Sequence, residues 1–547
     1  MHSFAIGLRL RRLPALTLTL AALGLVAGRA PAQNGGFPIA DSLNSEVSIG
    51  AAFDGQNFLV AVQGDASHHS NVGAQLVSPA GTLIGPLIST GRTGGAPLVA
   101  FGALDYLLVW TDDMAANDHI YGQLIGPAGT QGPLLVISQV DLPEDIAGVA
   151  WNGSNYLVVY HRDVDSVTGL SRVYGRLVSP GGSVGPEIQI SAGFGNYSMG
   201  HGSTAASDGA DYLVTWTDGQ NDYEVRARVV HANGGLGAEF SVNASLDPSD
   251  NPLSIGFGGT DYLVIWPDEL GGPGTDEWDL LGQRVSPGGT LVGGVIPVAT
   301  SPGAQHFATL AFDGSKYFAT WTDTSNDTDM DGCDPGEGSC WDIHGRFIDP
   351  AGVPIGAEWP IVVSDGDQFA SPVVFGAGKY LLVWTDGNLV PDEGGDVYGN
   401  FLPTAGFPEP YCTAKVNSQG CLPAIWFSGI PSATDPSPFD VGCDWVVSNQ
   451  FGILFYGFSP HNLPFQGGTL CVHPPITRTP VQNSGGNPPP TDCSGVFSYD
   501  FNARIQSGVD PSLVAGQVVY GQYWYRDPQS SPFGTGLSDA LQFDIQP

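Results

Sequence analysis

The densest group of potential metal ligands in this chain lies between Asp327 and Glu337. Aspartates occupy alternate positions, at Asp327, Asp329 and Asp331, and Gly332 follows them. Carboxylate oxygens at this spacing can wrap a hard cation, and the glycine permits the sharp turn of a calcium loop. We therefore expect calcium as a cofactor, with the ligands Asp327, Asp329, Asp331, Asp334 and Glu337.

This segment departs from a helix–loop–helix calcium site. Its twelfth position holds Gly338 instead of glutamate, and no helical pattern flanks it. A disulfide between Cys333 and Cys340 would constrain the loop instead. The alternative is a solvated acidic insertion that binds no metal.

Histidine and acidic residues precede several apolar segments that recur along the chain. His201 and His306 occupy equivalent positions in two of these segments. A histidine pair beside a carboxylate could act as acid and base, or bind a transition metal. The candidate catalytic residues are His201, His306, Glu46, Glu144 and Asp250. Asp145, Asn251, Gln305 and Gln368 belong to the same set of positions, and the competing interpretation is that all of them line a hydrated channel.

Aspartate also follows a repeated Trp-Thr pair, at Asp112, Asp218, Asp323 and Asp386. An active site needs one copy, so repetition favours a structural role in which the carboxylate accepts backbone N–H groups of its loop. The same loops contain further acids, so we expect one face of the molecule to be strongly acidic. These acids are Asp113, Asp163, Asp165, Asp222, Asp268, Asp276, Glu277, Asp279, Asp392 and Asp396.

The elements that position these residues repeat seven times. Phrases such as FGALDYLLVW, ending at Trp110, and FGGTDYLVIW, ending at Trp266, return about every 50 residues. Short strands at this period predict an all-β fold, a seven-bladed β-propeller with one four-stranded blade per repeat. The seventh repeat lacks a good fourth strand, and residues 35–40 resemble one. We expect this N-terminal strand to complete the last blade and so close the ring.

The repeats resemble those of a widespread set of bacterial secreted propellers, of the form DGxNYLVVWxD…DIYGxRVSPxG. The resemblance covers about residues 36 to 405. It implies the fold and carries little functional information, because such repeats occur in many extracellular proteins without an assigned activity.

The N-terminus is typical of a secretory signal. Arg9, Arg11 and Arg12 precede an apolar run, and Ala30-Pro31-Ala32 matches a cleavage site. We expect residues 1–32 to be removed and the mature protein to be secreted, extracellular or at the cell surface, with the periplasm as an alternative. The net charge of −36 disfavours nucleic acid and anionic lipid as partners. No later stretch is long and apolar enough to span a bilayer.

The seven cysteines are expected to form disulfides in an exported protein. The pairs we expect are Cys333–Cys340, Cys412–Cys421 and Cys471–Cys493, with Cys443 left as the odd thiol.

The composition changes after the propeller, which we place at residues 33–407. Residues 411–547 contain five of the seven cysteines and many turns between apolar strands, which predicts a β-sandwich of roughly seven to nine strands. Phrases including NSQGCLPAI from Asn417 and WYRDP from Trp524 resemble a C-terminal module of secreted proteins from planctomycetes and myxobacteria-like bacteria. That resemblance implies a role in surface attachment, sorting or stability. Trp524 and Tyr525 could stack on sugars, with core packing as the alternative use.

These patterns together favour a non-enzymatic, calcium-binding propeller. We expect it to bind a polysaccharide or an extracellular protein through an acidic face at the channel mouth. The alternatives are a polysaccharide lyase or glycoside hydrolase at the same place, and a structural component of the cell envelope.

Overall fold

The computed structural model describes residues 36–40, 46–64, 71–112, 118–165, 170–193, 204–218, 224–243, 254–268, 278–325, 341–363, 366–387, 395–404, 408–434 and 438–546. In these ranges the chain is nearly all β-structure, with one short helix, α1 (Phe501–Gln506). The expected signal segment, residues 1–32, and the expected calcium ligands lie outside the described residues.

The repeat region forms six sheets from 27 strands among its described residues. The first sheet has the order β2 (Glu46–Phe53), β3 (Phe58–Gly64), β4 (Asn71–Val77), β5 (Leu83–Phe101), β6 (Tyr106–Asp112), β7 (His119–Ile125) and β8 (Gln131–Ser138). The strand β5 serves both as the last strand of the first repeat and as the first strand of the second.

Each of the other five sheets has four strands. One contains β9 (Glu144–Trp151), β10 (Tyr156–Asp165), β11 (Leu170–Val178) and β12 (Val184–Gln189). A second contains β13 (Ala205–Ser207), β14 (Tyr212–Asp218), β15 (Glu224–Val230) and β16 (Leu236–Ser241). A third contains β17 (Ser254–Phe257), β18 (Tyr262–Asp268), β19 (Asp279–Val285) and β20 (Leu291–Ala299). The next contains β21 (Gln305–Phe312), β22 (Tyr317–Asp323), β23 (Asp342–Ile348) and β24 (Pro354–Val362). The last contains β25 (Asp367–Gly376), β26 (Lys379–Gly387), β27 (Asp396–Pro403) and, from the N-terminal end, β1 (Phe37–Ala40).

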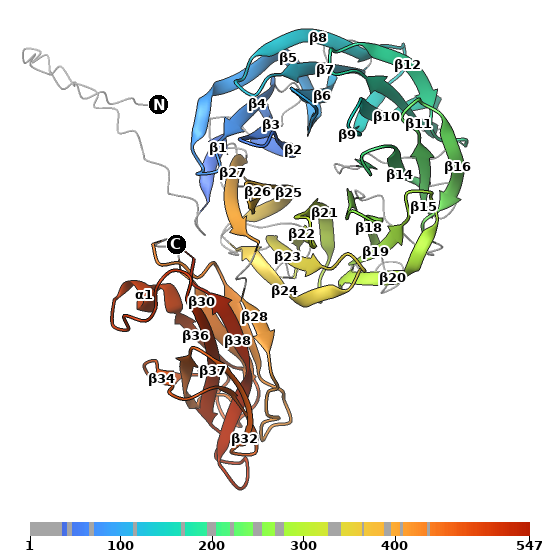
Figure 1. Ribbon diagram of the computed structural model, residues 1–547. Coiled ribbons are helices and arrows are strands. Elements are labelled where there is room, and N and C mark those ends of the chain that lie inside the picture. The colour runs from blue at the N-terminus through green and yellow to red at the C-terminus, as the bar shows by residue number, and fades with distance from the viewer. Residues whose placement is uncertain are drawn as a thin grey trace, which may run out of the picture. The chain divides into compact units, whose positions relative to one another are not determined.

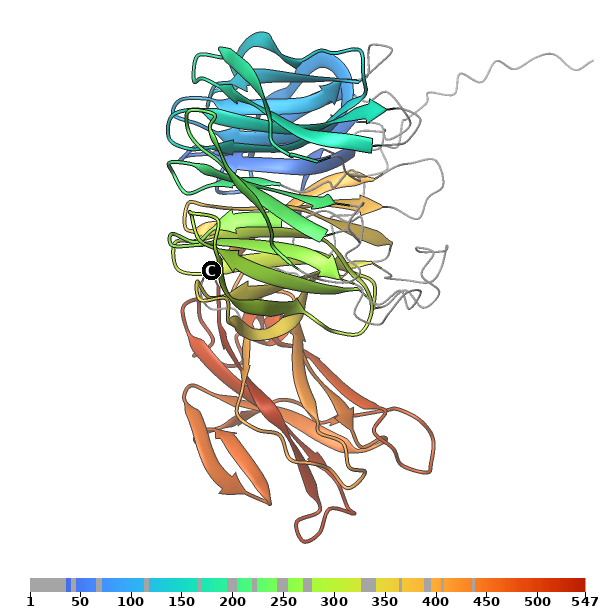
Figure 2. The ribbon, with the colours of Figure 1, turned by 90° about the vertical axis from the view of Figure 1, so that its right-hand side faces the viewer.

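These sheets surround a common centre, as expected of a propeller-like fold (Figure 1). Figure 2 shows the same region from its edge, with strands running between its two faces. The first strands of the repeats lie innermost, and β1 pairs antiparallel with β27, with Phe37 opposite Gly399.

The repeated sequence phrase has a physical basis in the hairpin between the first two strands. Gly55 turns with φ +95°, and the Asp54 carboxylate accepts the N–H groups of Gln56 at 2.7 Å and Asn57 at 2.6 Å. Because glycine adopts positive φ without strain, the Asp-Gly pair closes the turn. The strand that follows is buried from end to end in β6, β18 and β22.

The repeated tyrosine ties neighbouring sheets together. Tyr317 donates a hydrogen bond at 3.0 Å to the carbonyl of Asp261, which lies in the hairpin turn of the preceding sheet. Tyr156 and Tyr212 make the same contact with Asp105 and Asn155 of the preceding sheet. Tyr106 makes it with Asn57 of the preceding repeat, within the seven-stranded sheet. Gly258 is required beside this hydroxyl, because a Cβ there would meet the Tyr317 oxygen.

The second strand of the third repeat is longer than those of most other repeats. Although polar residues begin at Arg162, β10 continues to Asp165. Arg162 is buried between Glu144 and Glu187, so its backbone remains in the sheet.

The C-terminal region is built from eleven strands among its described residues. One sheet has the order β28 (Glu409–Tyr411), β38 (Thr535–Asp544), β37 (Val518–Arg526), β31 (Phe451–Gly457) and β34 (Thr477–Arg478), with β35 (Gln482–Asn483) also paired to β31. The others are β29 (Ala424–Ser428), β30 (Asp440–Val446) and β36 (Gly495–Asp500), and the hairpin β32 (Pro460–Phe465) with β33 (Gly468–Val472).

The two larger C-terminal sheets pack face to face. Phe497 of β36 stacks on Tyr523 of β37 with a centroid separation of 5.3 Å. Tyr525 is fully buried and belongs to this core. Trp524 is half-buried, and its indole donates a hydrogen bond at 2.8 Å to Gln466.

Two disulfides cross the C-terminal sandwich, and they differ from the predicted pairs. Cys412 is bonded to Cys471, and Cys421 to Cys493, over sequence separations of 59 and 72. The local pairs Cys412–Cys421 and Cys471–Cys493 are therefore wrong, because the sheet brings distant cysteines together. Cys443 is free and buried, as predicted. Cys333 and Cys340 lie outside the described residues.

Candidate ligand-binding site

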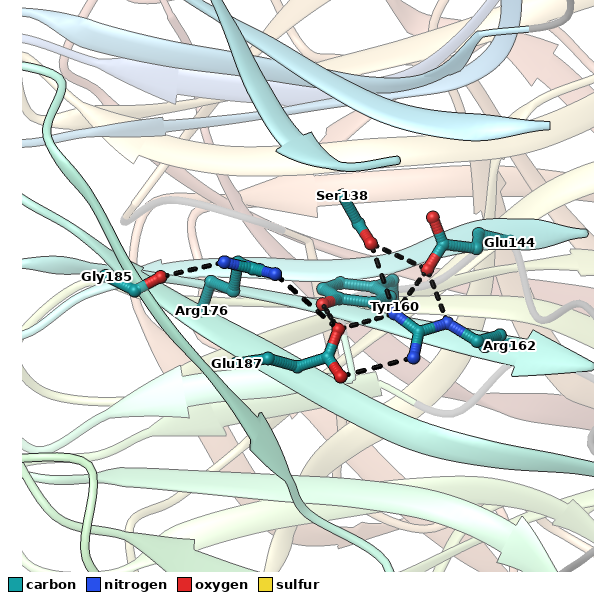
Figure 3. Close-up of polar contacts among 7 residues, drawn as sticks. All are labelled: Ser138, Glu144, Tyr160, Arg162, Arg176, Gly185 and Glu187. Atoms are coloured by element: carbon teal, nitrogen blue, oxygen red, sulfur yellow. Dashed lines mark hydrogen bonds and ion pairs between the residues drawn. The ribbon is translucent and has the colours of Figure 1, made fainter. Parts of the chain in front are cut away.

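Glu144, a candidate catalytic acid, is committed to an ion pair inside the fold. It lies at the start of β9 with 0% of its surface exposed. Its Oε1 accepts hydrogen bonds from Arg162 Nε and from Ser138 Oγ, each at 2.7 Å. Figure 3 shows both donors at this oxygen. The geometry does not favour Glu144 as a group that reaches a substrate.

Arg162 extends this network across its sheet. Its Nη1 donates to Glu187 of β12 at 3.2 Å, and Tyr160 donates to the other oxygen of Glu187 at 2.9 Å. The Arg162 guanidinium also lies 4.3 Å from the ring centroid of Tyr174 on β11. All four strands of the sheet are thus linked through one cation, while Ser138 adds the neighbouring sheet (Figure 3). Burying charges is unfavourable unless they are paired, so this network is structural.

Asp145 faces a second structural partner. The Asp145 carboxylate lies 3.8 Å from His161 Nε2 on the paired strand. Burial lowers the pKa of His161 to about 4, so this imidazole is neutral at physiological pH.

The other candidate residues that precede the recurring apolar segments are either buried or lie outside the described residues. Gln305 and Gln368 are both fully buried at the starts of β21 and β25. For Glu46 the structure describes the backbone in β2 only. His201, Asp250 and Asn251 lie outside the described residues, as do Asp113, Asp222, Asp276, Glu277 and Asp392. In the described ranges, no group of three or more His, Cys, Asp or Glu side chains could hold a metal ion.

The aspartates after the repeated tryptophan have partners within the sheets. The indoles of Trp110, Trp266 and Trp321 donate to Asp112, Asp268 and Asp323 at 3.3–3.4 Å. Asp112 also accepts two hydrogen bonds from Arg92, and Asp323 accepts the N–H of Ser325 at 3.0 Å. Most of these acids are buried, as are Asp218, Asp342 and Asp396. They support the strand ends and do not form an open acidic surface.

Four cross-strand acid pairs lie at the base of predicted acidic loops among the described residues. They are Asp218–Glu224, Asp268–Asp279, Asp323–Asp342 and Asp386–Asp396. Burial raises the pKa of Asp386 to about 6, and the charge of Asp396 adds to this effect.

His306 belongs to a row of five aromatic residues, which we call the aromatic row: Trp278, His306, Phe307, Phe369 and Trp341. The centroid separations along the row are 5.4, 6.1, 6.4 and 5.3 Å. All five side chains are partly exposed. The row spans the ends of three sheets, at the side where the second strands end and the third strands begin.

Backbone hydrogen bonds between sheets position the row. The N–H of Gln305 donates to the carbonyl of Trp278 at 2.8 Å, and the N–H of Gln368 donates to that of Trp341 at 2.8 Å. Each tryptophan, which precedes a third strand, is thereby fixed beside the first strand of the next sheet. Burial lowers the pKa of His306 to about 4, so the row carries no positive charge at neutral pH.

Phe307 adopts an unfavourable backbone conformation to take its place in the row. Its φ is +52°, in a bulge between His306 and Thr309. A bulky residue in this region is strained by about 1–3 kcal/mol, and such strain clusters at functional sites. Ala96 has the same φ in the corresponding bulge of β5, so the fold itself does not require an aromatic ring there.

The centre of the repeat region contains a cavity between its innermost strands. A cavity of about 340 Å³ lies among the innermost strands β2, β5, β9, β17, β21 and β25. Its side chains include Ile49, Leu98, Val149, Ile255 and Val373. None of the described residues that line this cavity is acidic. The acidic groups that we expected would have to lie further out, at the channel mouth.

Sequence reasoning identified only His306 of the aromatic row. The available signal was positional, because EWD at Trp278 and CWD at Trp341 place a tryptophan before the third strand in two successive repeats. The contact with His306 and Phe369 depends on how adjacent sheets meet, which no single repeat reveals.

Comparisons with known proteins identify no family. No family model matches the chain, and no curated protein matches it. A sialidase of Trypanosoma rangeli is 9% identical over 94% of this chain and 96% of its own, with a TM-score of 0.40. An acylaminoacyl peptidase of Pyrococcus horikoshii is 8% identical over 74% of this chain and 58% of its own, with a TM-score of 0.39. The hydrazine synthase of Kuenenia stuttgartiensis is 9% identical over 56% of this chain and 86% of its own, with a TM-score of 0.35. Similarity this low carries no argument about function.

Proposed function

We propose that this protein is an exported glycan-binding propeller whose ligand stacks on the aromatic row. The observation that carries the proposal is the row itself: five partly exposed aromatic side chains in continuous succession, one of them held in a strained backbone. Sugar rings present apolar faces that pack on aromatic rings, while their hydroxyl groups bond to polar side chains at the rim. A row of rings suits an extended chain of sugars better than one monosaccharide.

Binding is favoured over cleavage by the placement of the candidate acid. Glu144 is buried beneath Arg162, and His306 packs against Trp278 with a neutral imidazole. A lyase or glycoside hydrolase needs a group within hydrogen-bond reach of the scissile bond. Appearance of reducing ends or unsaturated sugars in a polysaccharide digest would restore the enzymatic alternative.

Export is supported by the two disulfides, since disulfides persist in oxidising compartments. Among the described residues, no helix has the length and apolar character needed to cross a membrane. Secretion into the medium, with cleavage after Ala32, tests this part of the proposal. Recovery of the intact chain from the cytoplasm would contradict it.

We also propose seven blades, the last of them completed by β1. The pairing of β1 with β27 supports this arrangement, because it joins the N-terminal end to the last repeat. Deleting residues 36–40 should then lower the melting temperature and expose β27 to aggregation.

Calcium remains part of the proposal for the segment from Asp327 to Glu337. Asp323 and Asp342 flank this segment, lie opposite each other and are each 1% exposed. Like charges placed directly opposite each other are destabilising, and a bound cation would offset their repulsion.

Glycan binding is tested by titrating the mature protein with neutral and charged oligosaccharides and measuring the heat of binding by calorimetry. Trp278→Ala and Trp341→Ala should each weaken binding by about tenfold, as for aromatic side chains that anchor an interface. The matched control is Trp445→Ala, because Trp445 is 60% exposed but lies in the C-terminal sandwich. Loss of binding only in the Trp445 variant would move the site to the C-terminal sandwich and contradict the proposal.

A further inference from the structure

The basic side chains of the repeat region are all committed to contacts within the fold. Residues 36–407 contain ten Lys and Arg residues, all of them described. Seven pair with carboxylates: Arg92, Arg162, Arg176, Arg226, Arg284, Lys316 and Arg346. The other three, Arg172, Arg228 and Lys379, donate to Gln189, to the carbonyls of Gly237 and Ile190, and to that of Pro79. An anionic ligand would have to break one of these contacts to gain a cationic partner.

The strand ends around the aromatic row have the opposite character. In the three sheets that contribute to the row, an acid lies at or next to the end of the second strand and another begins the third strand, in the pairs Asp268–Asp279, Asp323–Asp342 and Asp386–Asp396. These acids make the potential at this end of the three sheets negative, which attracts cations and repels uronic acids and sulfated sugars.

One described carboxylate lies directly beside the row. Asp367 and Phe369 are two residues apart in β25, so their side chains point to the same side of the strand. Both lie against Gly387 of the neighbouring strand: a Cβ built there would be 3.6 Å from Asp367 Cβ and 3.6 Å from Phe369 Cε2. Both side chains are partly exposed.

We propose that the aromatic row selects an amine-bearing glycan, a polymer of hexosamine units whose protonated amino groups lie beside Asp367 and over the ring faces. This inference rests on the proposed glycan-binding function and adds the chemical class of the ligand. Ammonium groups are attracted to the faces of aromatic rings and to carboxylates. Neutral sugars gain the stacking contacts alone, and anionic sugars meet repulsion.

The experiment compares three oligosaccharides of equal length by calorimetry at pH 6: β-1,4-linked glucosamine, β-1,4-linked glucose and galacturonate. The glucosamine oligomer should bind about fivefold to tenfold more tightly than the glucose oligomer, the size of a partly exposed ion pair with a cation–π contact. Its advantage should fall with added salt and disappear at pH 9, where the amines lose their protons. The galacturonate oligomer should bind least.

Variants locate the effect. Asp367→Asn should reduce the affinity for glucosamine about fivefold and leave that for glucose unchanged. Asp208→Asn is the matched control, because it removes the same charge at the opposite ends of the strands, and its amide oxygen still accepts the turn N–H groups of Ala210 and Asp211.

The outcomes separate the two proposals. Equal binding of glucose and glucosamine that depends on Trp278 would overturn the choice of ligand and leave glycan binding intact. Tighter binding of galacturonate would also overturn the choice of ligand. Failure of all three oligomers to bind would overturn the proposed function and this inference together.

Discussion

At the scale of single residues, Phe307 combines backbone strain with partial exposure. A phenylalanine at φ +52° is less stable than glycine at that position, yet its ring links His306 to Phe369. Such a conflict between local preference and placement is expected where a residue serves binding. The strain and the ring contacts can be separated by substitution.

We predict that Phe307→Gly changes the free energy of unfolding by less than about 1 kcal/mol, because relief of strain offsets the lost ring contacts. Affinity for the glycan should nevertheless fall by about tenfold, because the row is interrupted at its centre. Ala96→Gly is the control, since it relieves the same φ of 52° away from the row. Urea unfolding and calorimetry measure both effects. A Phe307→Gly protein that binds normally would assign the ring to packing alone.

The pKa of His306 predicts how stability responds to acid. Burial lowers this pKa from 6.5 to about 4, so folding favours the neutral imidazole. Above pH 6.5 the imidazole is neutral in both states and does not affect the free energy of unfolding. As the pH falls from 6.5 towards 4 only the unfolded state gains the proton, so the free energy of unfolding falls. His306→Phe removes the titration, and Phe369 shows that phenylalanine fits the equivalent position. Between pH 7 and pH 4 this variant should lose about 1–3 kcal/mol less than the wild type in urea unfolding.

His161 provides a comparison for that measurement. Its pKa is also lowered to about 4 by burial, and it lies in another sheet. The wild-type loss should therefore contain contributions from both histidines, and each single substitution should remove one of them. Identical acid sensitivity of His306→Phe and the wild type would show that His306 is not desolvated.

At the scale of elements, the repeated phrases could be predicted because local chemistry determines them. The Asp-Gly turn, the buried second strand and the Pro-Gly turns recur in each repeat, and their periods can be counted in the sequence. The partner of the repeated tyrosine could not be predicted, because the carbonyl that accepts its hydrogen bond belongs to the preceding sheet.

The tyrosine contact explains the glycine that follows the first strand in two repeats, Gly102 beside Tyr156 and Gly258 beside Tyr317. Gly258→Ala should lower the free energy of unfolding by about 1–3 kcal/mol, because the new methyl group meets the Tyr317 hydroxyl. Tyr317→Phe removes that oxygen, so the glycine substitution should cost less in the double variant. A double-mutant cycle in urea measures the coupling. Additive effects would mean that Tyr317 moves aside without cost.

The cysteines show a different limit of sequence reasoning. Local pairing was the simpler hypothesis, but spacing along the chain does not determine which strands are neighbours. Cys412 and Cys421 lie only nine positions apart, yet each is bonded to a cysteine much further along the chain. Cys443 was nevertheless predicted correctly as the free thiol, because the predicted and the observed pairs involve the same four cysteines.

At the scale of the whole molecule, the net charge decides under which conditions the proposed calcium binding has to be tested. Residues 1–32 contain four arginines and no acid, so removing them changes the net charge from −36 to −40. Self-repulsion at this charge destabilises the compact state, and salt should relieve it. Sodium chloride alone is therefore expected to raise the melting temperature, and any test for calcium has to be made at constant ionic strength.

Under that constraint, we predict that calcium raises the melting temperature more than magnesium or sodium, because alternating carboxylates can surround the larger and less strictly octahedral ion. A free calcium concentration of about 100 times the Kd would add about 2.7 kcal/mol to the free energy of unfolding. Asp329→Asn with Asp331→Asn should remove the difference between calcium and magnesium and leave the response to sodium unchanged. If the double variant retains the calcium response, the ions act through general screening or at another site, and the segment from Asp327 to Glu337 is a solvated acidic insertion.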